Sequence, residues 1–325
     1  TTTGARLAVD IGGTFTDCLV MDETGLLQQF KASTTPNDPT RGFMDAMGKA
    51  AQHYGVRLEQ FLGQIEVLVH GTTLATNILL TGRGAKVGML TTKGFRDTLE
   101  IRRAIRPINV SLYNLFIPPN RPLIPRSRRI GIEERTLYSG EIATPLNGLE
   151  VAEAVMKFKA QGVESIAISF LHSYANPANE LSAAAICREI APEIFVTTSH
   201  ETLPVWREFE RFSTTAVGAY VGPAVGRYLT SLERALKESG FRGTFLVMLA
   251  NGLVQNVSEC MHRPVFLLHS GPAAAPSGAV HLGRYLGDDK LLSVDMGGTS
   301  FDVCMIEKGE IPATTEHWES DQRVA

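Results

Sequence analysis

The sequence contains two copies of one short, acidic and glycine-rich tract. Residues 7–17 have the sequence LAVDIGGTFTD, and residues 292–302 have the sequence LSVDMGGTSFD. Each copy begins with apolar residues, turns at a Gly-Gly pair and continues into a second apolar run, a pattern typical of a β-hairpin. The repeat indicates two related domains that close on one ligand.

The residues shared by the two tracts suit the binding of a nucleotide phosphate. Glycines let the backbone approach a ligand closely and direct N–H groups at an anion. Thr14 and Thr299 add hydroxyl donors. An ordinary hairpin whose aspartates only cap the turn is the alternative, and the duplication makes it the weaker interpretation. The predicted nucleotide-binding residues are Gly12, Gly13, Thr14, Thr16, Asp17, Gly271, Gly297, Gly298, Thr299, Ser300 and Asp302.

A second motif, His70-Gly71-Thr72-Thr73, lies between an apolar strand at 65–70 and an apolar helix at 74–80. Ligands favour the carboxyl end of a strand, and anions favour the amino end of a helix. Capping of the helix by a threonine is an equally good and compatible interpretation. We predict that His70, Thr72 and Thr73 lie beside the substrate or the transferred phosphoryl group. Asp10 and Asp295 are predicted to be catalytic through Mg²⁺, held directly or through water.

Composition excludes several classes of function. The net charge of −3 provides no general field for nucleic acid or for an anionic membrane. An arginine-rich segment at 101–147 has few aromatic side chains, so a solvated or subunit-facing loop is a better interpretation than a nucleic-acid arm. No apolar run reaches transmembrane length, and four scattered cysteines are typical of reduced thiols in a cytoplasmic protein. P-loop, Rossmann and G-x-S-x-G patterns are absent from the sequence.

The order of predicted elements indicates an α/β fold. Strands near 5–11, 65–70 and 86–91 alternate with helices, and the alternation resumes at 149–198. Residues 206–238 predict a long helix with a break at Gly222-Pro223. His172 and His200 each follow a strand and are candidate catalytic groups, although a lone histidine is more often structural.

Six stretches closely resemble the hydantoinase A/5-oxoprolinase family of the actin, sugar-kinase and heat-shock-chaperone ATPase superfamily. They are VDIGGTFTD (9–17), HGTTLATN (70–77), LTTKGFRD (90–97), SFLHSYANP (169–177), SGPAA (270–274) and DMGGTSFD (295–302). The resemblance implies duplicated actin-like ATPase (ribonuclease H-like) domains with an inserted α/β subdomain, the second ATPase domain being truncated. The predicted domains are residues 1–95, 96–200 and 201–325.

The resemblance also implies an ATP- and Mg²⁺-dependent enzyme. In the hydrolases of the family, the carbonyl of a cyclic amide such as a hydantoin, 5-oxoproline or a lactam is phosphorylated before water opens the ring. A ketone carboxylase subunit is the alternative enzyme, and a nucleotide-gated binding module is the alternative of another class. A second subunit of the hydantoinase B type and a higher oligomer are the expected partners. Family chains are longer, so this chain is expected to be an incomplete portion of the enzyme.

Overall fold

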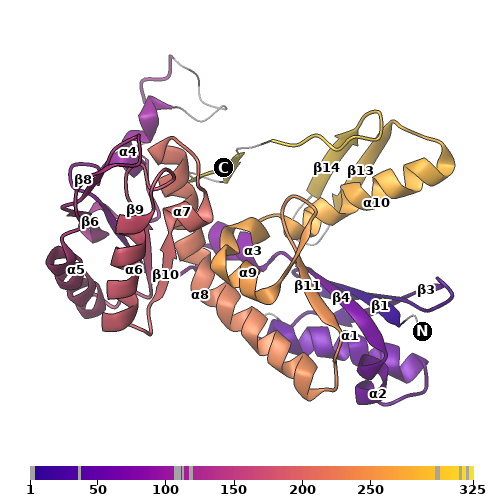
Figure 1. Cartoon of the computed structure of the whole chain (residues 1–325). Helices are drawn as coiled ribbons and strands as arrows, with labels where there is room; N and C mark the ends of the chain where they lie inside the picture. The colour runs from indigo at the N-terminus through magenta and orange to yellow at the C-terminus, as the bar shows by residue number, and fades with distance from the viewer. Residues whose placement is uncertain are drawn as a thin grey trace. The chain divides into compact units, whose positions relative to one another are not determined.

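The computed structural model describes residues 4–35, 38–105, 111, 113–116, 120–296, 301–314, 317–319 and 322–325 (Figure 1). The chain forms two compact units. The first unit contains Thr1–Asn77, Val225–Met261 and Phe266–Ala313, and the second contains Ile78–Ala224, His262–Val265 and Thr314–Ala325. These units are defined by packing, whereas the predicted boundaries concern repeated ATPase domains, so those boundaries stay a prediction.

The first unit is built on a mixed sheet of six strands in the order β12-β11-β4-β1-β2-β3. β1 pairs antiparallel with β2 and parallel with β4, and β4 pairs parallel with β11. Apolar residues alternate along β1, where Leu7, Val9 and Ile11 are buried. The strands are β1 (Ala5–Ile11), β2 (Phe15–Met21), β3 (Leu27–Ser33), β4 (Ile65–Thr72), β11 (Thr244–Met248) and β12 (Val254–Asn256).

Helix α1 (Pro39–His53) packs along β1, β2 and β3 of this sheet (Figure 1). Proline at its first position is compatible with a helix start, because that N–H has no partner within the helix. Phe43, Ala46, Met47 and Ala50 are fully buried, as their helical spacing predicts. The unit also contains α2 (Leu58–Gly63), the start of α3 (Leu74–Thr81), most of α9 (Val257–His262) and α10 (Ser270–Leu286).

The second copy of the acidic tract also forms a hairpin, β13 (Leu291–Met296) with β14 (Phe301–Ile306). Asp295 pairs with Asp302 in this hairpin, just as Asp10 pairs with Asp17 between β1 and β2. The prediction that both tracts form hairpins with opposed carboxylates is therefore confirmed. Whether the hairpins belong to duplicated actin-like domains stays a prediction.

The second unit contains a parallel sheet of four strands in the order β10-β9-β5-β6. Helices α5 (Gly148–Ala160) and α6 (Ala178–Ile190) pack together beside it, and Val155, Phe158, Ile168 and Cys187 lie in their shared core (Figure 1). The α/β class is thus confirmed. The strands are β5 (Val87–Thr92), β6 (Arg129–Ile132), β9 (Ser165–Ser169) and β10 (Phe195–Thr198).

Shorter elements complete the second unit. These elements are two small antiparallel pairs of strands and several short helices. They are α4 (Thr98–Ile101), η1 (Arg102–Ala104), η2 (Arg126–Arg128), β7 (Arg135–Thr136), β8 (Ile142–Thr144), α7 (Ser199–Thr202), β15 (His317–Glu319) and β16 (Gln322–Val324). A further turn, η3 (Pro264–Leu267), contains residues of both units.

Helix α8 (Glu208–Glu238) differs from the expectation, because it continues through Pro223 without the predicted break. Val221 and Val225 are buried on either side of the proline. Gly222 lies against the ring of Phe195, where a Cβ atom would come within 2.5 Å. Apolar packing around Pro223 therefore offsets the hydrogen bond that proline cannot donate.

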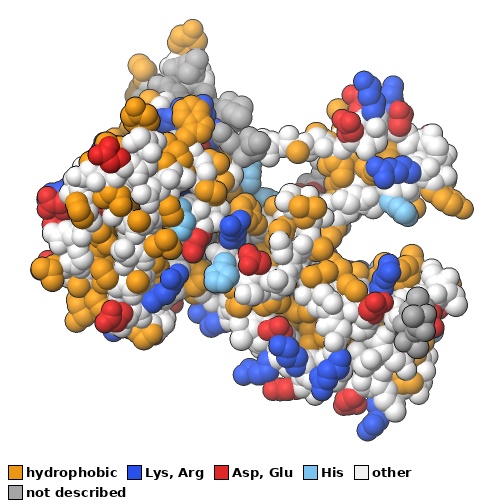
Figure 2. Space-filling model, viewed as in Figure 1, with side chains coloured by type: hydrophobic (Ala, Val, Ile, Leu, Met, Phe, Trp, Pro, Cys, Tyr) orange, Lys and Arg blue, Asp and Glu red, His pale blue; other side chains and the backbone are white. Residues whose placement is uncertain are grey.

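The surface carries mixed charge. Figure 2 shows acidic and basic side chains interspersed over the visible part of the described residues, without a continuous field of one sign. No helix in the described part of the chain is long and apolar enough to cross a membrane.

Candidate functional site

The turn between β1 and β2 is held in shape by a hydrogen bond of its own backbone and by two from Thr34, which follows β3. Gly12 N–H donates to the Phe15 carbonyl at 3.0 Å, and the Thr34 hydroxyl donates to the Gly12 carbonyl at 2.9 Å. Thr34 N–H donates to the Thr14 carbonyl at 2.9 Å. Because these bonds occupy carbonyl groups, the backbone between Gly12 and Thr14 is fixed while Gly13 and Thr14 stay exposed.

Thr16 takes a different place from its neighbours in the predicted nucleotide site. Its side chain is fully buried, and its hydroxyl lies 3.1 Å from the hydroxyl of Thr34. The geometry thus favours support of the turn by Thr16, and its contact with nucleotide stays a prediction.

Asp10 lies at the end of β1 with access to solvent, but neighbouring backbone crowds its carboxylate. A Cβ atom on Gly71 would lie 2.9 Å from Asp10 Oδ1, and one on Gly271 would lie 3.6 Å from it. Burial, together with the negative charges of Asp295 and Asp17, raises the pKa of Asp10 from 3.8 to about 6. The negative charge of Asp295, from the second tract, therefore acts on Asp10 within the first unit.

Asp17, on the opposite strand, has its own basic partner. Lys31 Nζ lies 3.2 Å from Asp17 Oδ1, and Gln29 donates to the same oxygen at 3.3 Å. Within the described ranges, no lysine, arginine or histidine forms an ion pair with Asp10. The uncompensated charge at Asp10 is the one that a bound cation would neutralise.

Four predicted nucleotide-binding residues, Gly297, Gly298, Thr299 and Ser300, lie outside the described residues. Asp295 and Asp302 flank them at the ends of β13 and β14. Among the described side chains, no group of three or more His, Cys, Asp or Glu residues converges on one metal position. A cation at this site would therefore keep most of its ligands as water or phosphate oxygens, as Mg²⁺ commonly does.

The His70-Gly71-Thr72-Thr73 motif joins β4 to α3 beside Asp10. β4 lies parallel to β1 with Asp10 opposite Gly71, which places the motif next to the carboxylate. The Thr72 hydroxyl accepts a hydrogen bond from Leu74 N–H at 3.1 Å, so the capping interpretation is confirmed for Thr72. The Thr73 hydroxyl accepts from Asn77 at 3.1 Å.

The start of α10 is attached to the same motif. The Ser270 hydroxyl donates to the Thr72 carbonyl at 2.8 Å, and His269 N–H donates to the Thr76 hydroxyl at 2.9 Å. Gly271 follows, and a Cβ atom there would lie 3.3 Å from Thr73 Cγ2. The β1–β2 turn, the β4–α3 junction and the amino end of α10 thus meet around Asp10.

His70 is fully buried, and both of its ring nitrogens lie within hydrogen-bond distance of protein groups. Its Nδ1 lies 3.1 Å from the Val9 carbonyl, which requires Nδ1 to carry the proton. Tyr228, on α8, donates its hydroxyl to His70 Nε2 at 2.8 Å. Burial lowers the pKa of His70 from 6.5 to about 4, so the ring is neutral. Both ring nitrogens are used inside the protein, and direct contact of His70 with substrate stays a prediction that this geometry does not favour.

Tyr228 was not singled out by the sequence, since a tyrosine within a long amphipathic helix carries no local signal of function. It contacts the site through His70, whose bond to Val9 holds the residue just before Asp10. Burial and the charge of Asp10 raise the pKa of Tyr228 well above its usual value, so the hydroxyl stays protonated and donates. Tyr228 and His70 therefore support the strand residue that precedes Asp10.

We expect Tyr228→Phe to leave His70 Nε2 buried without a donor, at a cost of about 1–3 kcal/mol in the free energy of unfolding. Urea unfolding should show this loss. The ATP hydrolysis that the family resemblance implies should also slow, because β1 loses part of the support beside Asp10. Tyr285→Phe is the matched control, since Tyr285 is 88% exposed and should tolerate the change. Equal stability of the two variants would contradict this role for Tyr228.

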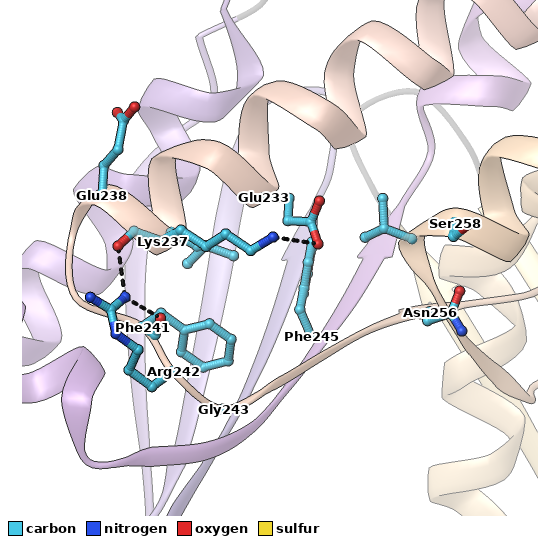
Figure 3. Close-up of a pocket in the computed structure, with 11 residues that line it drawn as sticks. Glu233, Lys237, Glu238, Phe241, Arg242, Gly243, Phe245, Asn256 and Ser258 are labelled. Carbon is cyan, nitrogen blue, oxygen red and sulfur yellow. Dashed lines mark hydrogen bonds and ion pairs between the residues drawn. The ribbon is translucent and has the colours of Figure 1, made fainter.

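A cavity of about 650 Å³ lies elsewhere in the first unit, between the end of α8 and the start of β11 (Figure 3). Three of its charged side chains already interact with the protein: Lys237 pairs with Glu233 at 3.2 Å, and Arg242 donates to the carbonyls of Lys237 and Phe241 at 3.0 Å each. The cavity is beside the amino end of β11, whereas Asp10 is at the carboxyl end of parallel β1. It is thus separate from the Asp10 site.

Comparisons with known proteins find two matching family models. The family model "Hydantoinase/oxoprolinase N-terminal region" matches residues 6–191, and the model "Hydantoinase/oxoprolinase" matches residues 211–324. The chain is 36% identical to the caprolactamase subunit alpha of Pseudomonas jessenii over 94% of this chain and 44% of that protein.

Two solved structures are similar over nearly the whole chain. The nucleotide-free structure of acetone carboxylase superimposes with a TM-score of 0.88 at 28% identity, covering 99% of this chain and 46% of that one. The ATP-dependent caprolactamase of Pseudomonas jessenii superimposes with a TM-score of 0.85 at 34% identity, covering 98% and 46%. The chain spans about half the length of the relatives it matches. With family models matching most of its residues, the chain belongs to the hydantoinase/oxoprolinase family.

Proposed function

We propose that this chain carries ATP-binding residues of an enzyme that phosphorylates the carbonyl oxygen of a cyclic amide before ring opening. The observation that carries the proposal is the meeting of the β1–β2 turn, the β4–α3 junction and the amino end of α10 around Asp10, which has no basic partner among the described residues. Such a site suits a metal-bound polyphosphate, and the related caprolactamase is described as ATP-dependent.

The residues around Asp10 fit the transfer of a phosphoryl group. Catalysis of that transfer depends on positioning and on neutralising charge, for which Mg²⁺ would supply the positive charge when bound. Asp10 and Asp295 would hold the cation through its water ligands. N–H groups at Gly13 and Thr14 would bind phosphate oxygens, and Gly271 gives a ligand room at the amino end of α10.

Thr73 is the member of the β4–α3 motif that we place beside the transferred group. Its side chain contacts both the position of Gly271 and the start of α3, and it is only partly buried. Thr72 is 3% exposed and occupied as a cap, so its contribution is to the shape of the junction.

A lactam, a hydantoin or 5-oxoproline is the proposed substrate class, by similarity to the caprolactamase and to the family. The ketone carboxylase function is the second candidate, favoured by the TM-score of 0.88 to acetone carboxylase. Both reactions would begin with phosphorylation of a carbonyl oxygen, so the site around Asp10 serves either.

The test is ATP hydrolysis by the full-length protein with its partner subunit. We expect a cyclic amide to stimulate ADP release in the presence of Mg²⁺, without a requirement for bicarbonate. Stimulation only by a ketone with bicarbonate would instead support the carboxylase. ATP turnover that no carbonyl compound stimulates would contradict both and favour a nucleotide-gated binding module.

The expected partner is a second family subunit, since the related caprolactamase chain is named as a subunit. Co-purification of the full-length protein with the product of a neighbouring gene is the measurement. A cytoplasmic location is proposed for the assembled enzyme.

A further inference from the structure

One face of the β13–β14 hairpin is apolar and open to solvent. Side chains alternate between the two faces of a strand, so residues that lie opposite one another share a face. Three such pairs form this face, and each of their side chains is between 51% and 77% exposed. The pairs are Leu292 with Met305, Val294 with Val303, and Met296 with Phe301. A contiguous apolar surface of this kind marks a place where another segment binds.

Helix α10 packs on the other face of the hairpin (Figure 1). Leu291 precedes Leu292 on β13, so its side chain points to the opposite face. It lies so close to α10 that a Cβ atom on Gly283 would come within 2.5 Å of Leu291 Cδ1. The exposed apolar face is therefore the one that α10 leaves open.

The first copy of the tract shows the same face when it is covered. β1 and β2 have the same register, with Leu7 opposite Val20 as Leu292 is opposite Met305. Helix α1 lies against this face, since a Cβ atom on Gly42 would come within 3.3 Å of Thr16 Oγ1. The six corresponding side chains are only 0% to 5% exposed, and they belong to Leu7, Val9, Ile11, Thr16, Cys18 and Val20.

The edges of the two hairpins differ in the same way. In the first copy, β3 pairs antiparallel with β2, and β4 pairs parallel with β1. Within the described ranges, β13 and β14 form a sheet of two strands without a third. An unpaired edge presents N–H and C=O groups to which a further strand can bind. The second hairpin thus has both a face and edges that are occupied in the first.

The described segment after β14 is engaged elsewhere. In the first copy, β2 leads into β3 and then into α1. After β14, the chain instead attaches to α8 through β16. Arg323 N–H donates to the Ser213 hydroxyl at 3.2 Å, and Ala325 N–H donates to the Thr214 hydroxyl at 3.0 Å. The element that covers the second hairpin therefore comes from elsewhere.

We propose that a segment of the full-length protein outside residues 1–325 covers this face with an amphipathic helix, as α1 covers the first hairpin, and adds a strand antiparallel to β14, as β3 does to β2. Relatives extend over about twice this length, and a protein of their size has the residues for such a segment. A second copy stacked face to face would cover the apolar side chains but leave both edges unpaired. A segment that provides a helix and a strand accounts for both the face and the edge.

The first test places the photo-crosslinking residue p-benzoylphenylalanine at Val303 in the full-length protein. Irradiation should join it to a peptide outside residues 1–325 whose apolar residues are three and four positions apart. Protein assembled from a mixture of isotope-labelled and unlabelled chains should give only products in which both peptides have the same label. The same probe at Leu19, which is 39% exposed in β2, is the control and should not reach that peptide. A link to a second copy, to a partner subunit or to residues 1–325, or no link at all, would overturn the inference.

The second test is the thermal unfolding of full-length Val303→Asn. A buried amide in place of valine should lower the melting temperature by about 5 °C or more, whereas an exposed substitution has little effect. Leu19→Asn is the matched control, in the second strand of the first hairpin, and should change the melting temperature by less than about 2 °C. Equal melting temperatures of the two variants would show that the face stays exposed and overturn the inference. Neither test requires ATP hydrolysis, so the inference can fail without the proposed function failing.

Discussion

Asp10→Asn should abolish ATP hydrolysis while the folded protein becomes no less stable at pH 7.5. The substitution keeps size and hydrogen bonding but removes the charge that would hold the metal, so we expect turnover to fall about 100-fold or more. The pKa of Asp10 is about 6 in the folded protein against 3.8 for the free side chain. The folded state therefore holds the proton more tightly, and this carboxylate lowers stability as pH rises from about 4 to 6. Above about pH 6 the charged carboxylate lowers the stability of the folded protein, and asparagine removes that charge.

Thermal unfolding and ATP hydrolysis at pH 7.5 provide the two measurements. Asp22→Asn is the control, since Asp22 lies in the β2–β3 turn and accepts bonds from the N–H groups of Thr24 and Leu26. Its pKa is lowered, chiefly by the Thr24 side chain, so its charge stabilises the fold once pH exceeds the ordinary range for aspartate. Asp22→Asn should lose stability and keep activity. Parallel loss of melting temperature and activity in Asp10→Asn would show that Asp10 is a fold residue.

Gly71→Ala should also lower the rate of ATP hydrolysis strongly. The added Cβ atom would lie 2.9 Å from Asp10 Oδ1. Cβ atoms in proteins essentially never come this close to another atom, so the carboxylate must move. We expect turnover to fall at least about tenfold, equivalent to about 1.4 kcal/mol of lost transition-state stabilisation. Steady-state ATP hydrolysis by the folded variant is the measurement.

Gly226→Ala is the matched control for this change. Gly226 lies in α8 with open space around the new methyl group, and alanine should stabilise the helix by about 0.5–1 kcal/mol. If Gly71 acts through Asp10, the double variant Gly71→Ala/Asp10→Asn should be as active as Asp10→Asn alone. A further loss in the double variant would show that Gly71 has a separate role.

The local pattern of residues determined much of this protein. Alternating apolar residues around Gly12–Thr14 are sufficient to specify a hairpin, because strand, turn and strand follow one another in the chain. The same is true of the strand–helix junction at 70–74 and of the register that opposes Asp10 to Asp17. The helical spacing of Phe43, Ala46, Met47 and Ala50 likewise accounts for their burial in α1. Each of these features depends on neighbours within a few residues.

Only the tertiary structure decided how these local features are used. Proximity of Asp10, Gly71 and Gly271 results from parallel pairing of β1 with β4 and attachment of α10 to Thr72, contacts that join distant parts of the chain. Tyr228 reaches His70 across 158 positions, and with the Val9 carbonyl it occupies both ring nitrogens of this buried histidine. Glu180 selects His200 rather than His172 as the oriented imidazole. A side chain's charge and hydrogen-bond partners depend on what surrounds it in space, and sequence spacing does not specify that environment.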